Sequence, residues 1–172
     1  MMPIAKGLSS GYQPISACLV HERIANAVGE HGEFFHGYTY SGHPVACAVA
    51  LENIRIIEEE GLVERVRDDI GPYFQNKLHE MADHRLVGQV QGLGLLGAME
   101  LVADKKTATP FRNVGTVGTM ARDHSLDIGL VMRAVGDRLV LSPPLVITRG
   151  EVDELFEKAR MAIDRTAADL GR

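Results

Sequence analysis

The first sixty residues alternate between short apolar runs and turns rich in glycine and polar residues. Residues 1–8 predict the end of a short strand that runs into a loop, and Ile15–Val20 predicts a buried strand because it is compact and apolar. His21–Glu30 predicts a short helix. His31–Pro44 gathers glycine, aromatic and hydroxyl residues without a helical or strand period, which is typical of a structured loop that carries function.

Two helices are predicted after this loop. Pro44 suits the first position of a helix because its missing N–H is not needed there, and the helix continues to Glu60 before Gly61 ends it. A second, amphipathic helix follows, and Gly71-Pro72 is expected to bend it. Its expected buried face consists of Val63, Val66, Ile70, Tyr73 or Phe74, and Leu78.

Strands and helices are mixed in the second half of the chain. Val87–Val102 alternates glycine with apolar residues and predicts a strand pair or one bent strand, and Gly115–Ser125 predicts a helix. Leu130–Leu141 predicts two strands around a Gly136-Asp137 turn.

The last predicted element is a helix over Thr148–Leu170. Thr148 can cap this helix, and Glu151, three residues on, completes a capping box. The order of elements predicts an α/β protein with a domain boundary in the helical stretch after about Asn53.

The composition is that of an ordinary globular protein. The formal net charge is −5 and the basic residues are scattered among acids, so no nucleic-acid partner is expected. No apolar run is long enough to span a bilayer, and no secretory signal is recognisable. Cys18 and Cys47 lie far apart, so we expect reduced thiols in a cytoplasmic protein. The histidines lack a zinc-binding spacing, and no metal is expected.

One glycine motif is misleading. Gly92, Gly94 and Gly97 form a literal G-x-G-x-x-G, but a dinucleotide site needs these glycines to open a helix after a strand. The residues that follow, Ala98–Val102, alternate like a strand. We therefore expect a glycine-rich strand packed closely against a helix.

Lys6 is the first candidate for chemistry. It lies in AKGLSSGYQP, and a lysine at the inner end of a buried strand is costly unless its charge has a function. Desolvation lowers the pKa of an amine, which favours imine formation with a carbonyl compound. Its position alone still favours an ordinary surface lysine.

Three runs of sequence change that interpretation: AKGLSSGYQP, FHGYTYSGHP and GLVMRAVGDRLVLSPPL. In this order and spacing, over essentially the whole chain, they resemble the class III aminotransferases that use pyridoxal 5'-phosphate (PLP). Within that family they are most similar to omega-amino-acid and amine:pyruvate transaminases. The resemblance implies an α/β fold in which residues 1–53 are the C-terminal end of the large PLP-dependent transferase domain. Residues 54–172 would form the small C-terminal α/β domain.

The resemblance implies roles for four residues. Lys6 matches the lysine that forms an imine with PLP and then moves a proton between substrate and cofactor. Thr39 matches a threonine whose hydroxyl and amide bind the cofactor phosphate across a dimer interface, and Tyr38 matches an aromatic residue that lines the neighbouring subunit's pocket. Arg133 matches the arginine whose planar fork binds the carboxylate of amino or keto acids.

Plainer alternatives stay open for three of these residues. Thr39 would then only stabilise its own turn, Tyr38 would only pack at a dimer interface, and Arg133 would be a surface residue of a hairpin.

The implied reaction moves an amino group from an amine or omega-amino acid to a keto acid such as pyruvate, in a homodimer. Family members are far longer than this chain, and most of their cofactor domain precedes the lysine. We expect either a truncated reading frame or a genuine short gene product, and in both cases a chain that is inactive alone. Two alternatives remain. One is a relative that catalyses another PLP reaction, such as amino migration, and the other is a non-catalytic remnant that acts through its dimerisation surface.

Overall fold

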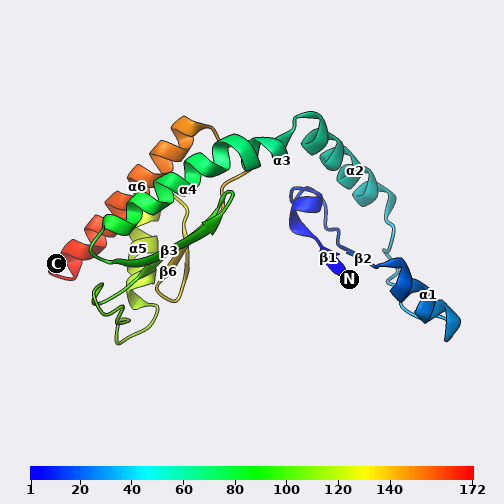
Figure 1. Ribbon diagram of the computed structural model, residues 1–172, viewed down its shortest axis with the longest axis horizontal. Coiled ribbons are helices and arrows are strands. Elements are labelled where there is room, and N and C mark those ends of the chain that lie inside the picture. Colours follow the sequence, from blue (N-terminus) through cyan, green and yellow to red (C-terminus); the bar gives the residue numbers. More distant parts are fainter. The chain divides into compact units, whose positions relative to one another are not determined.

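The computed structural model describes residues 1–172, which form two compact units, Met1–Gly61 and Leu62–Arg172 (Figure 1). The division follows helix α2 (Pro44–Glu59), whereas the boundary expected after Asn53 falls inside that helix. The assignment of residues 1–53 and 54–172 to two domains therefore stays a prediction. No helix of the chain is long and apolar enough to cross a membrane.

The first unit begins with a two-stranded antiparallel sheet. Strand β1 (Met2–Ile4) pairs with β2 (Ala17–Leu19), and the 3₁₀ turn η1 (Lys6–Leu8) follows β1 directly. Helix α1 (Glu22–Glu30) comes next, as predicted. The segment 31–43 has neither helix nor strand, which confirms the predicted loop.

Helix α2 closes the first unit. It begins at Pro44, as expected for a proline in the first helical turn, and Gly61 ends the helical stretch with a left-handed φ of +59°. Figure 1 shows α2 beside the η1 turn.

Burial in the first unit is sparse. Only Ser9, Ala46 and Ala50 are buried. The prediction of a buried strand over Ile15–Val20 is right about the strand and wrong about its burial, because every residue of β2 is exposed. A sheet of two strands has no central strand, and its faces need further elements to cover them.

The second unit begins with an irregular helix. Helix α3 (Leu62–Arg65) continues through a π-helical turn, η2 (Val66–Ile70), into α4 (Gly71–Glu80). The wider turn has a local cause: Pro72 has no N–H to donate, and the amide of Gly71 donates to the carbonyl of Val66, five residues back.

The π turn also shifts the buried face by one residue. Ile70, Phe74 and Leu78 are fully buried, as predicted. Val63 is exposed, and its neighbour Leu62 is buried instead. The expected bend at Gly71-Pro72 thus takes the form of a π turn, which contains one residue more than a regular helical turn.

A four-stranded antiparallel sheet forms the centre of this unit, with the order β3-β4-β6-β5. The Gly136-Asp137 turn joins β5 to β6, as predicted, and the strand pair over 87–102 is also confirmed. The remaining elements are η3 (Met81–Asp83), β3 (Val87–Leu93), β4 (Leu96–Leu101), α5 (Thr116–Asp127), β5 (Arg133–Val135), β6 (Arg138–Leu141) and α6 (Arg149–Asp169).

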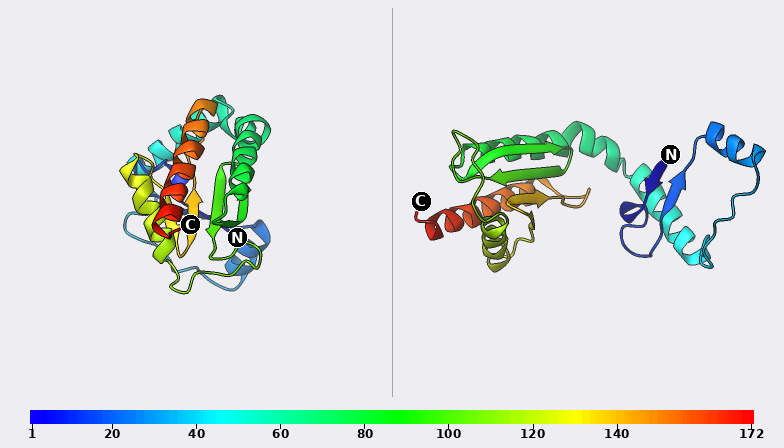
Figure 2. Two further views of the ribbon diagram at one scale, coloured as in Figure 1. Left: turned by 90° about the vertical axis from the view of Figure 1, so that its left-hand side faces the viewer. Right: turned by 90° about the horizontal axis from the view of Figure 1, so that it is seen from below.

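Helices cover this sheet and enclose the core. Helix α4 packs on β3 and β4, α5 packs on β5 and β6, and α6 lies between α4 and α5 (Figure 2). The large core residues of the chain all belong to this unit. Thr148 and Glu151 form the predicted capping box at the start of α6.

The misleading glycine motif lies in the β3–β4 hairpin. Gly94 makes the turn with a φ of +58°, and Gly97 lies in β4 against α4. A Cβ on Gly97 would lie 3.0 Å from both Phe74 and Leu78, so the glycine allows the strand and the helix to approach closely. This confirms the structural interpretation of the motif.

Candidate functional site

Lys6 lies in a tight turn with an unusual backbone. Its φ is +50° and that of Ser10 is +49°, both in the left-handed region that residues with a Cβ rarely adopt. Such strain persists where surrounding contacts enforce it, and it gathers at functional sites. The Lys6 side chain is exposed, as are Met2 and Pro3, so the expected burial of this strand end is not found within the chain.

Hydrogen bonds hold this turn against α2. The amide nitrogen of Asn53 donates to the carbonyls of Gly7 at 2.9 Å and Leu8 at 3.2 Å. The amide oxygen of Asn53 accepts from Ser10 Oγ at 2.6 Å. Ser9, which is buried, donates its hydroxyl to the Gln13 carbonyl at 2.6 Å and closes the other end of the turn.

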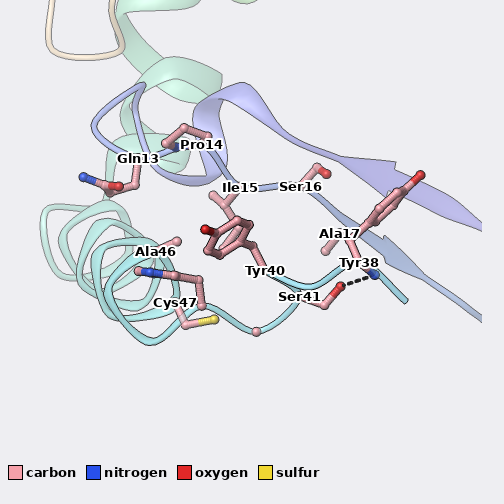
Figure 3. A pocket seen from close by; sticks show the side chains of 12 residues that line it. Gln13, Pro14, Ile15, Ser16, Ala17, Tyr38, Tyr40, Ser41, Ala46 and Cys47 are labelled. Carbon is pink, nitrogen blue, oxygen red and sulfur yellow. Dashed lines mark hydrogen bonds between the residues drawn. The ribbon is translucent and has the colours of Figure 1, made fainter. Parts of the chain in front are cut away.

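Two hollows adjoin the turn. A small one of about 220 Å³ is lined by Lys6 and by the segment that follows it. A larger one, of about 910 Å³, lies between residues 13–17 and the segment from Tyr38 to the start of α2. Both hollows share Gln13, Pro14 and Ile15 as lining residues. In Figure 3 the Tyr40 ring points into the larger hollow toward Ile15.

Thr39 belongs to a turn at the entrance of α2. The amide of Tyr38 donates to Ser41 Oγ at 3.1 Å (Figure 3). The amide of Ser41 donates back to the Tyr38 carbonyl at 2.9 Å. The amides of Thr39, Tyr40 and Gly42 have no partner within the chain. Free N–H groups in a turn before a helix N-terminus, where the helix dipole is positive, suit an anionic group such as phosphate.

Tyr38 and Thr39 both lie in the exposed loop, and the exposed fraction of the Tyr38 residue is 75%. Tyr38 lines the larger hollow, and its ring contacts that of His36 edge-on. Phe34, Phe35 and Tyr40 are exposed too. This set of aromatic rings, Phe34, Phe35, Tyr38 and Tyr40, is called the aromatic loop below.

Arg133 lies in the second unit. It is the first residue of β5, opposite Val140 of β6, and its side chain is exposed. Arg138 of the same hairpin pairs with Glu100 at 2.8 Å, whereas Arg133 forms no ion pair within the chain. Its guanidinium is therefore free to bind a carboxylate.

The hairpin that carries Arg133 is anchored on α5. The carboxylate of Asp137 is buried and accepts from the amides of Gly115 at 3.0 Å and Gly118 at 2.8 Å. The contact is close: a Cβ on Gly118 would lie 2.2 Å from the carbonyl oxygen of Gly136. Asp137 thus caps α5 and holds the turn of the hairpin.

The sequence alone does not identify Asn53 as a residue that holds the Lys6 turn, or Asp137 as one that holds the Arg133 hairpin. Asn53 carries a signal in hindsight, because it is the amide in an otherwise apolar or charged helix over 44–59. The sequence pattern indicates Asp137 only as a residue of the predicted hairpin turn. Its contact with α5 depends on tertiary packing, which no local pattern reports.

The family model described as "Aminotransferase class-III" matches residues 1–163. The chain belongs to the class III aminotransferases.

Relatives in this family are similar to the chain in sequence and in fold. A putrescine–pyruvate aminotransferase of Pseudomonas aeruginosa is 52% identical over 98% of this chain and 37% of its own length. A thermostable omega transaminase mutant from Pseudomonas jessenii has a TM-score of 0.90 at 41% identity, over 99% of this chain and 39% of its own. A PMP-bound aminotransferase from Vibrio fluvialis has a TM-score of 0.89 at 36% identity, over 96% of this chain and 37% of its own.

The likeness confirms the family and fold class expected from the sequence. The chain spans well under half the length of these class III aminotransferases. The roles of Lys6, Thr39, Tyr38 and Arg133 are not tested by it and stay predictions.

Proposed function

We propose that this class III aminotransferase chain takes part in PLP-dependent transfer of an amino group from an amine or omega-amino acid to a keto acid such as pyruvate. The observation that carries the proposal is the Lys6 turn. A lysine in a strained left-handed backbone, held by hydrogen bonds from α2 and with an exposed amine, is suited to a reaction at that amine.

The residues around Lys6 fit the cofactor. Lys6 is exposed and forms no ion pair within the chain, whereas Lys77 and Lys158 do. Its amine would hold PLP by condensing with the aldehyde group, with loss of water. Thr39 and the free amides of Tyr40 and Gly42 suit the phosphate, in the site of a second subunit as the family resemblance implies. When bound, PLP withdraws electrons from the substrate carbon that loses its proton.

Two side chains then act on the substrate. Lys6 would hold PLP through its Nζ, and the same amine, when free, would accept the proton from the substrate carbon and return it later in the transfer. Arg133 binds the carboxylate of the keto acid through two parallel hydrogen bonds, which its lack of an ion pair within the chain permits.

The aromatic loop supports a homodimer. Its four rings are between 73% and 89% exposed, and large exposed aromatic groups are enriched at interfaces between subunits. A second copy of this chain that covers the loop would also bring Tyr38 and Thr39 to the partner's cofactor. A cytoplasmic location remains part of the proposal.

The test is alanine formation from pyruvate with PLP and an amine donor. Putrescine, the donor named for the Pseudomonas aeruginosa relative, is the first to try, followed by a panel of omega-amino acids. The native protein that carries this sequence is used, because the chain spans 37% of that relative. Activity that disappears in Lys6→Ala and persists in the exposed control Lys106→Ala supports the proposal. Protein that binds PLP but aminates no keto acid, or equal activity in both variants, contradicts it.

A further inference from the structure

The Lys6 turn is held by one side chain from a distant part of the sequence. Asn53 lies half-buried in α2, and its amide makes three hydrogen bonds to the turn: two donated to carbonyls and one accepted from a hydroxyl. The amide thereby uses both its donor and its acceptor on residues that directly follow Lys6.

The bonded groups are those that set the backbone of the turn. Gly7 and Leu8 follow Lys6 directly, and their carbonyls point to Asn53. Ser10, the second residue with a left-handed φ, donates to it. An unfavourable φ at Lys6 persists only while neighbouring contacts outweigh the strain. The three bonds from Asn53 supply such contacts to the residues that follow Lys6.

We propose that Asn53 is a positioning residue that holds the amine of Lys6 in its reactive orientation. The inference rests on the proposed function, because it assigns Asn53 a role in presenting Lys6 to PLP. Without the amide, the turn can relax toward a right-handed φ at Lys6, which turns the side chain away from its present direction. An amine displaced by about 1 Å reacts much more slowly with a bound partner, by up to about a hundredfold.

Asn53→Ala tests this without weakening α2. Alanine is a better helix former than asparagine, so a loss of function would not come from loss of the helix. Asn53→Asp is the second variant: it keeps an acceptor for Ser10 but sets a carboxylate against the carbonyls of Gly7 and Leu8. Glu58→Ala is the matched control, because Glu58 is exposed on the same helix and its side chain makes no hydrogen bond or ion pair in the chain.

Two measurements are made on the native protein. The first is the rate at which borohydride traps PLP on the peptide that contains Lys6. We expect this rate to fall about tenfold or more in Asn53→Ala and Asn53→Asp and to stay unchanged in Glu58→Ala. The second is hydrogen exchange of the amides of residues 8–12 without PLP, which should become faster in both Asn53 variants because the turn opens more often.

The outcomes separate the two proposals. If wild-type protein traps no PLP on Lys6, the proposed function fails, and the exchange measurement alone decides whether Asn53 holds the turn. Faster exchange with an unchanged trapping rate would make Asn53 merely structural and overturn the inference. Unchanged exchange and unchanged trapping in Asn53→Ala would overturn it as well.

Discussion

Arg133 is the residue whose environment most directly suggests substrate binding. Arg138 of the same hairpin is paired with Glu100. Arg133 instead leaves its guanidinium free while Asp137 anchors the hairpin on α5. Recognition of a carboxylate requires an arginine whose guanidinium is unpaired and whose backbone is held in place.

Arg133→Ala should therefore weaken use of keto acids. Hydrogen bonds to charged groups contribute about 1.5–3 kcal/mol, so kcat/KM for pyruvate should fall roughly ten- to a hundredfold. The kcat/KM for amine donors that lack a carboxylate should fall much less. Steady-state kinetics of the native protein measure both, with Arg138→Ala as the control on the same hairpin. An equal loss in the control would assign the effect to the fold of the hairpin.

His84 is a buried histidine that links the segment between η3 and β3 to α6. Its Nε2 lies 3.1 Å from Asp164 Oδ1, and its Nδ1 accepts from the amide of Leu86 at 3.1 Å. Burial lowers the pKa of His84; the hydrogen bond and charge of Asp164 oppose this, and Arg160 and Arg85 add to the lowering. A second proton would have to sit on Nδ1, against the N–H of Leu86.

The lowered pKa of His84 predicts how stability depends on pH. Because the folded chain holds this proton less tightly than the unfolded chain, its contribution is complete above the ordinary value of 6.5 and is lost as pH falls below it. The loss amounts to about 1.4 kcal/mol for each unit of lowering. Urea unfolding at pH 7.5, 6.5 and 5.5 measures it. A His84→Gln variant should show a smaller loss over this range, and an identical slope would contradict the assignment.

Helix α6 illustrates what local sequence determines at the scale of one element. Its capping box was predictable because the residues that form it lie three apart in the chain. Thr148 Oγ1 accepts from the amide of Glu151, and the Glu151 carboxylate accepts from the amide of Thr148 at 2.8 Å. The same bond and that of the Thr148 hydroxyl lower the pKa of Glu151.

Thr148→Ala should destabilise the second unit by about 1 kcal/mol, the usual cost of removing a helix N-cap. The change is measured as a lower urea midpoint by circular dichroism at neutral pH. Thr119→Ala is the control, since Thr119 is exposed on α5 and caps no helix. A Thr148→Ala midpoint equal to that of the control would show that the capping box contributes nothing.

The stretch over 62–80 shows where local sequence is insufficient. Helical spacing correctly placed Ile70, Phe74 and Leu78 in the core, since these residues are four apart from the end of the π turn through α4. The π turn before Pro72 was not predicted, so Val63 was assigned to the wrong face. A one-residue insertion changes which residues before the π turn face the core, and the apolar spacing alone does not reveal the insertion. Packing against the rest of the unit decides which face is buried.

The same limit applies to the candidate site. Lys6, Thr39, Tyr38 and Arg133 lie in contiguous motifs, and sequence alone could propose them. Asn53 could not be proposed with them, because its contacts with Gly7 and Leu8 join positions 46 and 45 residues apart. Motifs report which side chains are present, whereas their support depends on contacts between distant segments.

At the scale of the whole molecule the two units differ in their cores. The second unit holds the large buried cluster, including Phe74, Met99 and Phe156, while the first buries one serine and two alanines. Burial of apolar area supplies most of the stability of a domain, at about 25 cal/mol per Å². The second unit therefore has the means to fold by its own contacts, and the first depends on whatever covers its exposed apolar residues.

Hydrogen exchange of the isolated chain should show this difference. Amides of β4, β6 and α6 are expected to exchange slowest, and those of β1, β2 and α1 to exchange orders of magnitude faster. Protection that appears over β2 and the aromatic loop with rising protein concentration would support a dimer. Equal protection of both units in dilute, monomeric chain would contradict the contrast in core size.

Borohydride trapping of PLP measures whether Lys6 binds the cofactor. The native protein is incubated with PLP, reduced and digested, and the peptides are identified by mass spectrometry. We expect a phosphopyridoxyl group on the peptide that contains Lys6, and its absence in Lys6→Ala. Exposed lysines such as Lys106 should carry the phosphopyridoxyl group only at the level found in the unfolded protein. An adduct spread evenly over surface lysines, or none on the Lys6 peptide, would show that Lys6 is not the residue that binds PLP.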